Sequence, residues 1–229
     1  EIGRGAFGVV YRATDDDGHS YALKRLNPAA FQQQEHAMLI KRFEREVRYQ
    51  QQVDHPNVVR ILVANLTDNP PWFLMPLADG SLKDDLEANN TLGGDPKRPL
   101  FDILAGLEAL HQVGLRHRDL KPANVLKFPQ PDGSTCYCAN NFRRATAQAD
   151  IYSFGAILHD IFSGGGRIPH GELTAAGPLG PIIEKCTKAQ PRRRYVSIAA
   201  LREELFDVLD NTVVEFFSAE EQDVIAILN

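Results

Sequence analysis

The chain has 229 residues, 43% of them hydrophobic and 24% charged, and a formal net charge of −5. This size and composition fit a globular protein with one large domain or two small lobes. The negative charge argues against nucleic acid as a partner, and no apolar run approaches the ~20 residues that span a bilayer. The sequence opens without a methionine and already inside a motif, so we expect a fragment of a longer protein.

The three cysteines, Cys136, Cys138 and Cys186, cannot all pair with one another. In a chain of this length an odd number favours a reducing compartment over a disulfide scaffold. We therefore expect a cytoplasmic location, for the chain or for this domain of a larger protein. Cys136 and Cys138 lack the further ligands of a zinc site, and two residues apart on a strand they are expected to share one face.

The first third of the chain is predicted to be rich in strands. An Asp-Gly turn within residues 15–20 separates two β-prone runs, which indicates a hairpin. Residues 31–53 are polar and helix-forming, with Met38, Phe43 and Val47 expected on one face. The strand-like runs are residues 8–14, 21–26, 58–66 and 72–78.

The second part of the chain has helical periodicity. Apolar residues recur every three or four positions across residues 99–114, which predicts a helix that ends near Gly114. Ser218 and Glu221 form a capping box that predicts a last helix over residues 219–228. The apolar stripe of the first helix comprises Leu100, Ile103, Leu104, Leu107 and Leu110, and further helices are predicted over residues 149–162, 180–189 and 197–210.

Strand signals followed by helical ones predict an α+β protein in two lobes. The N-lobe is expected to be small and β-rich with one long helix, and the C-lobe larger and mainly helical. We place the N-lobe at residues 1–78, the C-lobe at 79–211 and a tail of unknown role at 212–229.

Two features of the N-lobe suggest chemistry. Gly3, Gly5 and Gly8 have GxGxxG spacing, but a β-prone run follows them instead of the helix that a dinucleotide-binding site requires. A glycine hairpin lying close over phosphates and a plain glycine-rich turn both remain possible. Lys24 ends a strand among apolar neighbours, where it could reach solvent or pair inward with Glu46, and spacing alone leaves both open.

The segment HRDLKPANVL contains the most specific motif. His117, Arg118, Asp119, Lys121 and Asn124 fall in the HRDxxxxN pattern, and the glycine loop, lysine and glutamate precede them in the right order. With these residues the sequence resembles the protein kinase family. The resemblance extends over nearly the whole chain, as far as about residue 211.

The resemblance implies a role for each of these positions. The glycines would cover the phosphates of ATP, and Lys24, oriented by Glu46, would hold the α- and β-phosphates. Asp119 would accept the proton of the attacking hydroxyl, and Asn124 would bind a magnesium ion. Lys121, two residues after Asp119, is the pattern of Ser/Thr kinases, so the implied partner is a protein substrate.

The same resemblance implies an adenine pocket between the lobes. Met75 would be the gatekeeper, Ala78 would donate its N–H to the adenine ring, and the carbonyl of Pro76 would face it. Core packing is the alternative for the apolar members. The nucleotide-binding residues implied in this way are Ile2, Gly3, Gly5, Phe7, Gly8, Val10, Ala22, Lys24, Met75, Pro76 and Ala78.

One part of the family pattern is missing. After Asn124 a hairpin is predicted over residues 125–139, but neither Asp-Phe-Gly nor Ala-Pro-Glu follows. Asn141–Arg143 could be a degenerate Asp-Phe-Gly with an amide as the second metal ligand. Alternatively, an activation segment is absent near residues 139–141. Arg194 favours this second interpretation, because it matches the family arginine that pairs with the missing glutamate, and a buried unpaired charge is costly.

The preferred function is that of an ATP- and magnesium-dependent kinase that phosphorylates Ser or Thr in proteins, with Asp119 as the base. The alternative is a pseudokinase, a nucleotide-binding or scaffolding module without phosphotransfer. A small-molecule kinase is disfavoured, because it would typically carry a looser catalytic loop. Substrate identity and oligomeric state are not encoded in any of these motifs.

Overall fold

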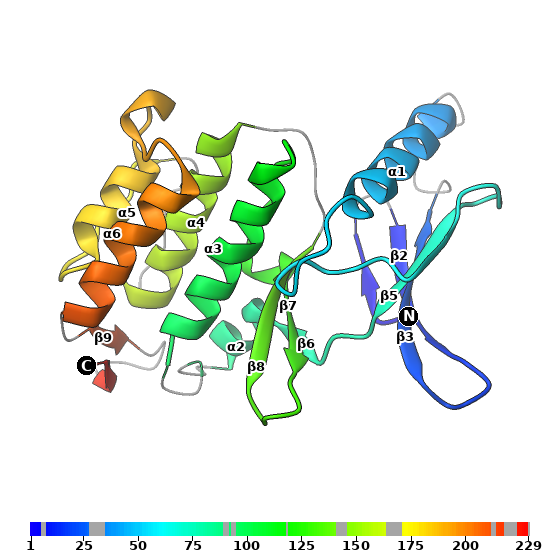
Figure 1. The fold of residues 1–229 in the computed structure, drawn as a ribbon, viewed down its shortest axis with the longest axis horizontal. Coiled ribbons are helices and arrows are strands. Elements are labelled where there is room, and N and C mark those ends of the chain that lie inside the picture. The colour runs from blue at the N-terminus through cyan, green and yellow to red at the C-terminus, as the bar shows by residue number, and fades with distance from the viewer. Residues whose placement is uncertain are drawn as a thin grey trace.

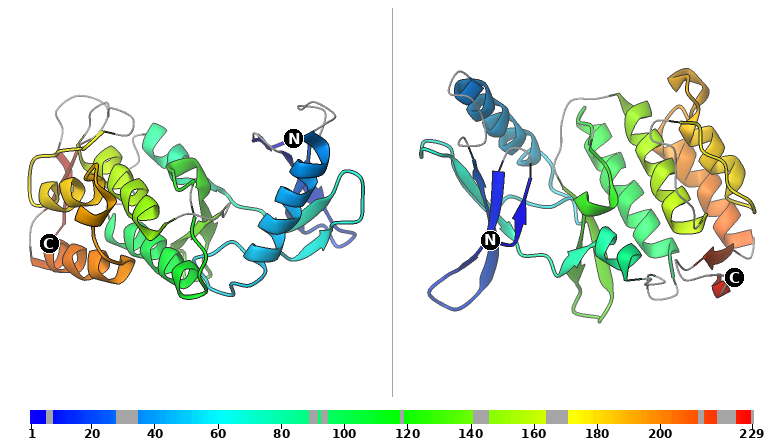
Figure 2. Two further views of the ribbon diagram at one scale, coloured as in Figure 1. Left: turned by 90° about the horizontal axis from the view of Figure 1, so that it is seen from above. Right: turned by 180° about the vertical axis from the view of Figure 1, so that it is seen from behind.

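The computed structural model of the chain has two lobes (Figure 1). An antiparallel sheet and one helix form the smaller, N-terminal lobe, and helices dominate the larger one, which Figure 2 shows from two further sides. The expected α+β architecture is therefore confirmed. The structure describes residues 1–5, 8–27, 35–88, 92, 95–117, 119–140, 146–163 and 171–211, and the backbone of residues 214–217 and 224–228.

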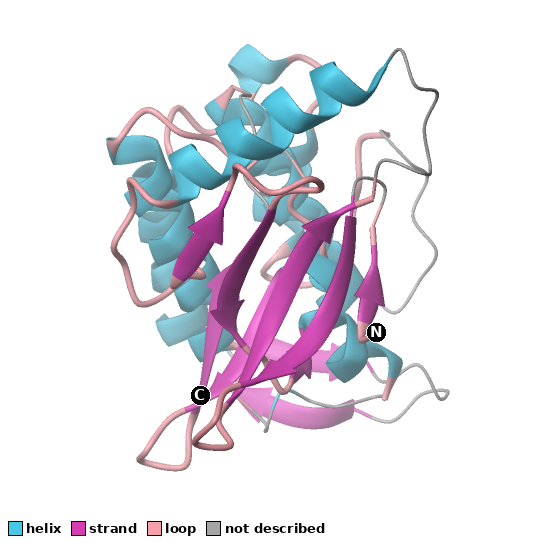
Figure 3. Cartoon of the chain, turned by 90° about the vertical axis from the view of Figure 1, so that its right-hand side faces the viewer, coloured by secondary structure: helices cyan, strands magenta, loops and turns pink. Residues whose placement is uncertain are grey.

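The N-lobe sheet consists of β1 (Gly3–Arg4), β2 (Gly8–Thr14), β3 (Ser20–Leu26), β4 (Val63–Asn65) and β5 (Trp72–Pro76). Their order is β1-β2-β3-β5-β4, with all neighbours antiparallel (Figure 3). β2 and β3 meet at the predicted turn, where Gly18 has φ +86°, a conformation that glycine adopts without steric cost. Side chains alternate along β3, so that Ala22 and Leu26 are buried.

Helix α1 (His36–Gln50) packs on this lobe through Leu39, Phe43 and Val47, which are all buried. The ring centroid of Phe43 lies 5.4 Å from that of Phe73 on β5. Burying an apolar side chain of this size contributes about 1.5–3 kcal/mol. This face therefore fixes the helix against the sheet.

The expectation that Met38 shares the buried face of α1 is wrong, because Met38 is 72% exposed. Leu39 takes that place instead. Four residues make slightly more than one helical turn, so Leu39 lies on the same face as Phe43. Met38 precedes Phe43 by five residues and therefore lies about 140° away from it around the helix axis. Residues 31–34 of the predicted helix lie outside the described residues.

The C-lobe elements are β6 (Gly80–Ser81), α2 (Leu82–Glu87), α3 (Lys97–Gln112), η4 (Pro122–Asn124), β7 (Val125–Pro129), β8 (Thr135–Ala139), α4 (Ala147–Phe162), α5 (Gly180–Thr187), η5 (Pro191–Arg193) and α6 (Ile198–Asn211). The predicted stripe of α3 is confirmed, since all five of its residues are fully buried. Helix α2 was not predicted, although Ser81 and Asp84 form a capping box at its start. Among the described residues, no helix is long and apolar enough to cross a bilayer.

Strand β8 lies where the two lobes meet. It pairs with β7 in the three-stranded sheet β6-β7-β8. Cys138 near its end packs in the N-lobe core with Ala22 and Met75. Val58, from the connection that follows α1, packs in the C-lobe core and forms a parallel bridge to Ala139. A displacement of β8 would therefore reach both lobes.

The predicted last helix is wrong. β9 (Val214–Phe217) and β10 (Val224–Leu228) pair with each other as antiparallel strands. Valine, isoleucine, leucine and phenylalanine dominate both segments, and branched and aromatic residues favour strands. This preference outweighs the capping-box signal at Ser218 and Glu221, two residues that lie outside the described ones.

Candidate active site

Lys24 on β3 and Glu46 on α1 form an ion pair inside the N-lobe. The distance from Lys24 Nζ to Glu46 Oε1 is 2.6 Å, and the two side chains are only 14% and 12% exposed. Partial burial lowers the local dielectric and strengthens such a pair. Of the two possibilities that the sequence left open, the structure therefore shows the inward pairing, which fixes the ammonium group in one place.

The catalytic loop holds Asp119 and Asn124 side by side. Asn124 Nδ2 donates to the backbone oxygen of Asp119 at 2.6 Å and to its Oδ2 at 3.1 Å. Lys121 Nζ lies 3.5 Å from the same Oδ2, and both side chains are substantially exposed. An exposed pair contributes little stability, but it places a positive charge beside the carboxylate. Arg118 lies outside the described residues.

Asp150, at the start of α4, supports this loop from within the C-lobe. Its carboxylate is fully buried, and Oδ2 accepts a hydrogen bond from His117 N at 2.9 Å and lies 2.8 Å from His111 Nε2. Burial lowers the pKa of His117 to about 4, so its ring is neutral near pH 7. The sequence analysis missed this role. The available signal was an aspartate inside an apolar helix, because a buried carboxylate needs partners.

The residues implied for the adenine pocket lie on three neighbouring elements. Ala22 on β3 lies opposite Met75 on β5, and both are 4% exposed. Val10 on β2 lies opposite Lys24. The N–H of Ala78, just beyond β5, has no hydrogen-bond partner in the part of the chain that the structure describes. Ala22 and Met75 thus belong to one apolar cluster, against which Val10 packs.

The glycine loop connects β1 to β2. Gly5 N donates to Gly8 O at 2.9 Å, which closes the turn. A Cβ on Gly8 would lie 2.7 Å from the backbone oxygen of Arg25, so a larger residue there requires a backbone shift. Phe7 lies outside the described residues. The remaining predicted residues are Gly3 in β1, opposite Val10 of β2, Ile2 just before β1, 49% exposed, and Pro76 at the end of β5.

Asn140, the first residue after β8, lies against the catalytic loop. Its N–H donates to Asn124 O at 3.1 Å, and its buried side chain has Oδ1 3.5 Å from Nε2 of Gln50 in α1. Gln50 Nε2 also donates to Val59 O at 2.6 Å. Asn140 thus joins the catalytic loop to α1. The segment Asn141–Arg143 lies outside the described residues.

Comparison with known proteins agrees with this geometry. Residues 1–130 match the family described as protein kinase domain. The chain belongs to the protein kinase family. The solved structure of the PpkA-294 apo form shares the fold, with a TM-score of 0.72 over 89% of this chain and 93% of that chain, at 18% identity.

Several curated kinases are similar to the chain. Serine/threonine-protein kinase 16 of Rattus norvegicus is 36% identical over 137 residues, which cover 55% of this chain and 43% of the relative. The Probable serine/threonine-protein kinase PknB of Lactococcus lactis subsp. lactis is 29% identical over 247 residues, which cover 94% of this chain and 37% of the relative. The chain thus spans less than half the length of these relatives. The second alignment is longer than the 229 residues of this kinase, so that relative contains residues that the chain lacks.

The side chains near the catalytic loop supply only some of the oxygen ligands that a magnesium site needs. In the family the β7–β8 hairpin leads into Asp-Phe-Gly, whose aspartate holds magnesium. Asn140 occupies the position directly after this hairpin. Mg²⁺ prefers carboxylate and phosphate oxygens. Asp119 offers a carboxylate and Asn124 an amide, while the side-chain oxygen of Asn140 lies near Gln50 of α1. The described residues therefore supply no second carboxylate at this position.

Arg194 has no carboxylate partner in the part of the chain that the structure describes. Its Nε donates to Lys188 O and its Nη1 to Gln148 O, both at 2.7 Å, and its guanidinium carbon lies 4.9 Å from the centre of the Tyr152 ring. Burial lowers the pKa of this arginine. Two carbonyls and a ring supply only partial negative charge, so the position suits an arginine with an acidic partner.

Proposed function

We propose that this domain is the catalytic domain of a Ser/Thr protein kinase, which transfers the γ-phosphate of ATP to hydroxyl groups of protein substrates. The observation that carries the proposal is the buried Lys24–Glu46 pair in one lobe together with the Asp119–Asn124 pair in the other. The names of the relatives, which are Ser/Thr kinases, support it. All three cysteines are free thiols, which supports a reducing, cytoplasmic setting.

In this mechanism the protein positions charge around the phosphoryl group. Lys24, held by Glu46, neutralises the α- and β-phosphates, and the glycine backbone between β1 and β2 lies over them. Asp119 orients the substrate hydroxyl and accepts its proton, while Lys121 stabilises the charge that develops on the γ-phosphate. Asn124 would hold a magnesium ion, which neutralises phosphate charge when it is bound.

We also propose that a kinase activation segment belongs between β8 and α4. Arg194 supports this, because its described partners leave its charge uncompensated. The longer Lactococcus lactis alignment supports it as well, since that relative has residues without a counterpart here. The test is the sequence of the transcript between the codons of Ala139 and Phe142. Uninterrupted coding without an inserted segment would contradict the proposal.

Asn140 favours a second candidate function, a pseudokinase that binds nucleotide without transferring phosphate. A neutral amide cannot replace the charge of the second carboxylate that the family uses to hold magnesium. On this alternative the domain signals through its nucleotide-bound shape. It predicts ATP binding without turnover, and it predicts that the change Asn140→Asp alone introduces turnover.

The deciding experiment compares the chain with Asp119→Asn and Asn140→Asp. Radiolabelled ATP and a mixture of Ser- and Thr-containing peptides report phosphotransfer, and a fluorescent ATP analogue reports binding. For a kinase, Asp119→Asn should lower turnover about 10²–10⁴-fold with little change in binding. Asp132→Asn, in the exposed β7–β8 turn, is the matched control and should leave both unchanged. Turnover that survives in Asp119→Asn would contradict the role of this residue.

A further inference from the structure

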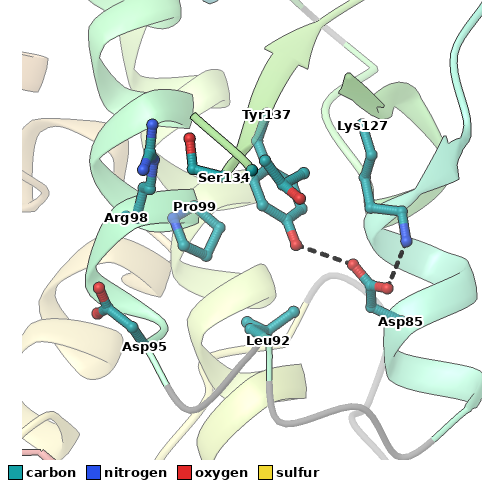
Figure 4. Close-up of a pocket in the computed structure, with 10 residues that line it drawn as sticks. Asp85, Leu92, Asp95, Arg98, Pro99, Lys127, Ser134 and Tyr137 are labelled. Atoms are coloured by element: carbon teal, nitrogen blue, oxygen red, sulfur yellow. Dashed lines mark hydrogen bonds and ion pairs between the residues drawn. The ribbon is translucent and has the colours of Figure 1, made fainter. Parts of the chain in front are cut away.

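Two thiols lie side by side behind the link between the lobes. Cys136 and Cys138 are on one face of β8, as expected, and their Sγ atoms are 3.5 Å apart. Tyr137 between them points to the opposite face, where its hydroxyl donates to Asp85 Oδ2 at 2.9 Å (Figure 4). Asp85 Oδ1 in turn binds Lys127 Nζ at 2.5 Å. The strand is therefore held at its centre, and the two sulfur atoms face one another without any intervening group.

The surroundings of the two thiols give small reagents access to one of them. A pocket of about 250 Å³ is lined by both cysteines and by His55 and Pro76. Cys136 is partly exposed, whereas Cys138 is 4% exposed. Both sulfur atoms lie near the same oxygen, that of Pro56, at 3.6 and 3.1 Å. Cys136 is thus the entry point and Cys138 the inner member of the pair.

A bond between the two sulfur atoms requires a local distortion of β8. Residues two apart on a strand are separated by about 6.6 Å along its axis, since each residue rises ~3.3 Å. Disulfides span Cα–Cα distances of about 4.4–6.8 Å, so this spacing lies near the upper limit. The two Cβ atoms point to the same face and are about as far apart as the Cα atoms, whereas a disulfide brings them to about 3.5–4.5 Å. A bridge therefore forms only when the backbone of β8 shortens and bends locally between the two cysteines.

We propose that Cys136 and Cys138 are a peroxide-sensitive dithiol that closes to an intrachain disulfide and weakens nucleotide binding. The Cys136 thiolate attacks hydrogen peroxide, the O–O bond breaks, and one water leaves as the sulfur becomes a sulfenic acid. The sulfur of Cys138 then attacks that sulfur, the S–O bond breaks, and a second water leaves. The two thiols together lose two electrons and two protons to the peroxide, and an external thiol reverses the step by exchange.

The electrostatics of the pair agree with this order of events. The hydrogen bond from Cys138 lowers the pKa of Cys136, which raises its thiolate fraction. Burial raises the pKa of Cys186, which lies in the C-lobe core without any described thiol beside it. Cys186 therefore serves as an unreactive reference within the same chain.

Closure of the bridge would reach the nucleotide site, an effect that rests on the proposed function. Cys138 packs with Ala22 and Met75, two of the residues implied to form the adenine pocket. It also precedes Asn140, which lies against the catalytic loop, by two residues. Because Tyr137 is held on the other face, a pull on Cys138 cannot be absorbed there and passes to these neighbours.

The first test follows the bond itself. The full chain is treated with a small excess of hydrogen peroxide, unfolded, alkylated and measured by intact mass and peptide mapping. The expected product has lost two hydrogens, has one alkylated thiol at Cys186, and contains a Cys136–Cys138 peptide that a reductant opens. Cys138→Ser should stop at a sulfenic acid on Cys136 that dimedone traps, and Cys136→Ser should not react. Reaction of Cys136→Ser at the wild-type rate, or dimers joined between chains, would overturn the proposal.

The second test follows the consequence. A fluorescent ATP analogue is titrated into the reduced and the oxidised chain, and into Cys138→Ser treated in the same way. Oxidation should weaken binding about fivefold or more in the wild type only, and reductant should restore it. A bridge without any change in affinity would overturn the regulatory half of the proposal. If the reduced chain does not bind the analogue at all, the proposed nucleotide site fails, while the bond is still judged by mass.

Discussion

The catalytic cluster and the surroundings of Arg194 differ in how their charges are compensated. In the cluster, Lys24 has Glu46, Asp119 has Asn124, and the buried Asp150 has a backbone N–H and a histidine. Arg194, which follows η5, has only two carbonyls and a ring among the described residues. A buried charge is stable when its partners are present, as in the catalytic cluster. A partly buried charge that has only neutral partners, such as Arg194, indicates that an acidic partner is missing.

Replacing Asp150 with alanine should cause the largest loss of stability, because it breaks the fully compensated catalytic cluster. It leaves the N–H of His117 and the ring of His111 without their acceptor, and each orphaned buried donor costs about 1–3 kcal/mol. The free energy of unfolding should fall by roughly 2–5 kcal/mol in chemical denaturation. Asp150→Asn keeps an acceptor for the N–H and should lose less. Asp207→Ala, at an exposed site on α6, is the matched control, and an equal loss there would contradict the buried role of Asp150.

The second prediction concerns pH and His117. Its pKa in the folded state is about 4, below the ordinary value of 6.5, so between these values the unfolded chain binds the proton and the folded chain does not. Stability should therefore fall as the pH falls through this window, by about 2 kcal/mol between pH 7 and pH 5. His117→Phe, which cannot titrate, should flatten this part of the profile, while the exposed His19→Gln should not. Identical profiles for all three proteins would contradict the assignment.

The third prediction compares two glycines of the loop between β1 and β2. Gly8→Ala places a Cβ 2.7 Å from Arg25 O and should cost about 1–3 kcal/mol of stability through the backbone shift it forces. At Gly5 the nearest atom lies at 3.9 Å, so Gly5→Ala should change stability by less than about 0.5 kcal/mol. Both should weaken nucleotide binding, because each adds a side chain where the proposed function places the phosphates. Thermal unfolding and nucleotide titration separate the two effects, and equal stability losses would contradict the steric argument.

The sequence predicted the two lobes and most helices, because periodicity and turn residues are local signals. The pairing of Lys24 with Glu46 could not be decided in this way, since the two are 22 positions apart and only the packing of α1 brings them together. The role of Asp150 was missed for a related reason, because burial is a property of the folded chain. Met38 shows where a prediction from helical periodicity fails: the buried face was assigned one residue too early, so Met38 is exposed and Leu39 is buried.

The position of Asn140 depended on strand register. The degenerate metal motif was sought at Asn141–Arg143, but β7 and β8 pair with Val125 opposite Ala139, and this register brings Asn140 next to Asn124. A shift of one residue would place a different residue beside Asn124 and turn its side chain to the other face. The identity of the family was available from the sequence because its motifs are specific, whereas the completeness of the site required the structure.

The smallest expected loss of stability is that of a substitution at Arg194, whose charge lacks an acidic partner among the described residues. Arg194→Met in this chain removes two hydrogen bonds to carbonyls and should cost about 1–2 kcal/mol, because a neutral hydrogen bond contributes roughly 1 kcal/mol. The exposed Arg192→Met is the control and should cost less than about 0.5 kcal/mol.

The same change should be repeated in the full encoded protein. If an activation segment supplies a carboxylate to Arg194, breaking that buried pair should cost about 3–5 kcal/mol there, measured by chemical denaturation in both proteins. A larger cost in the longer protein would mean that Arg194 has its acidic partner in the segment this chain lacks. Equal costs would mean that the carbonyls of Lys188 and Gln148 are the full set of partners of Arg194, and no acidic partner would then be missing.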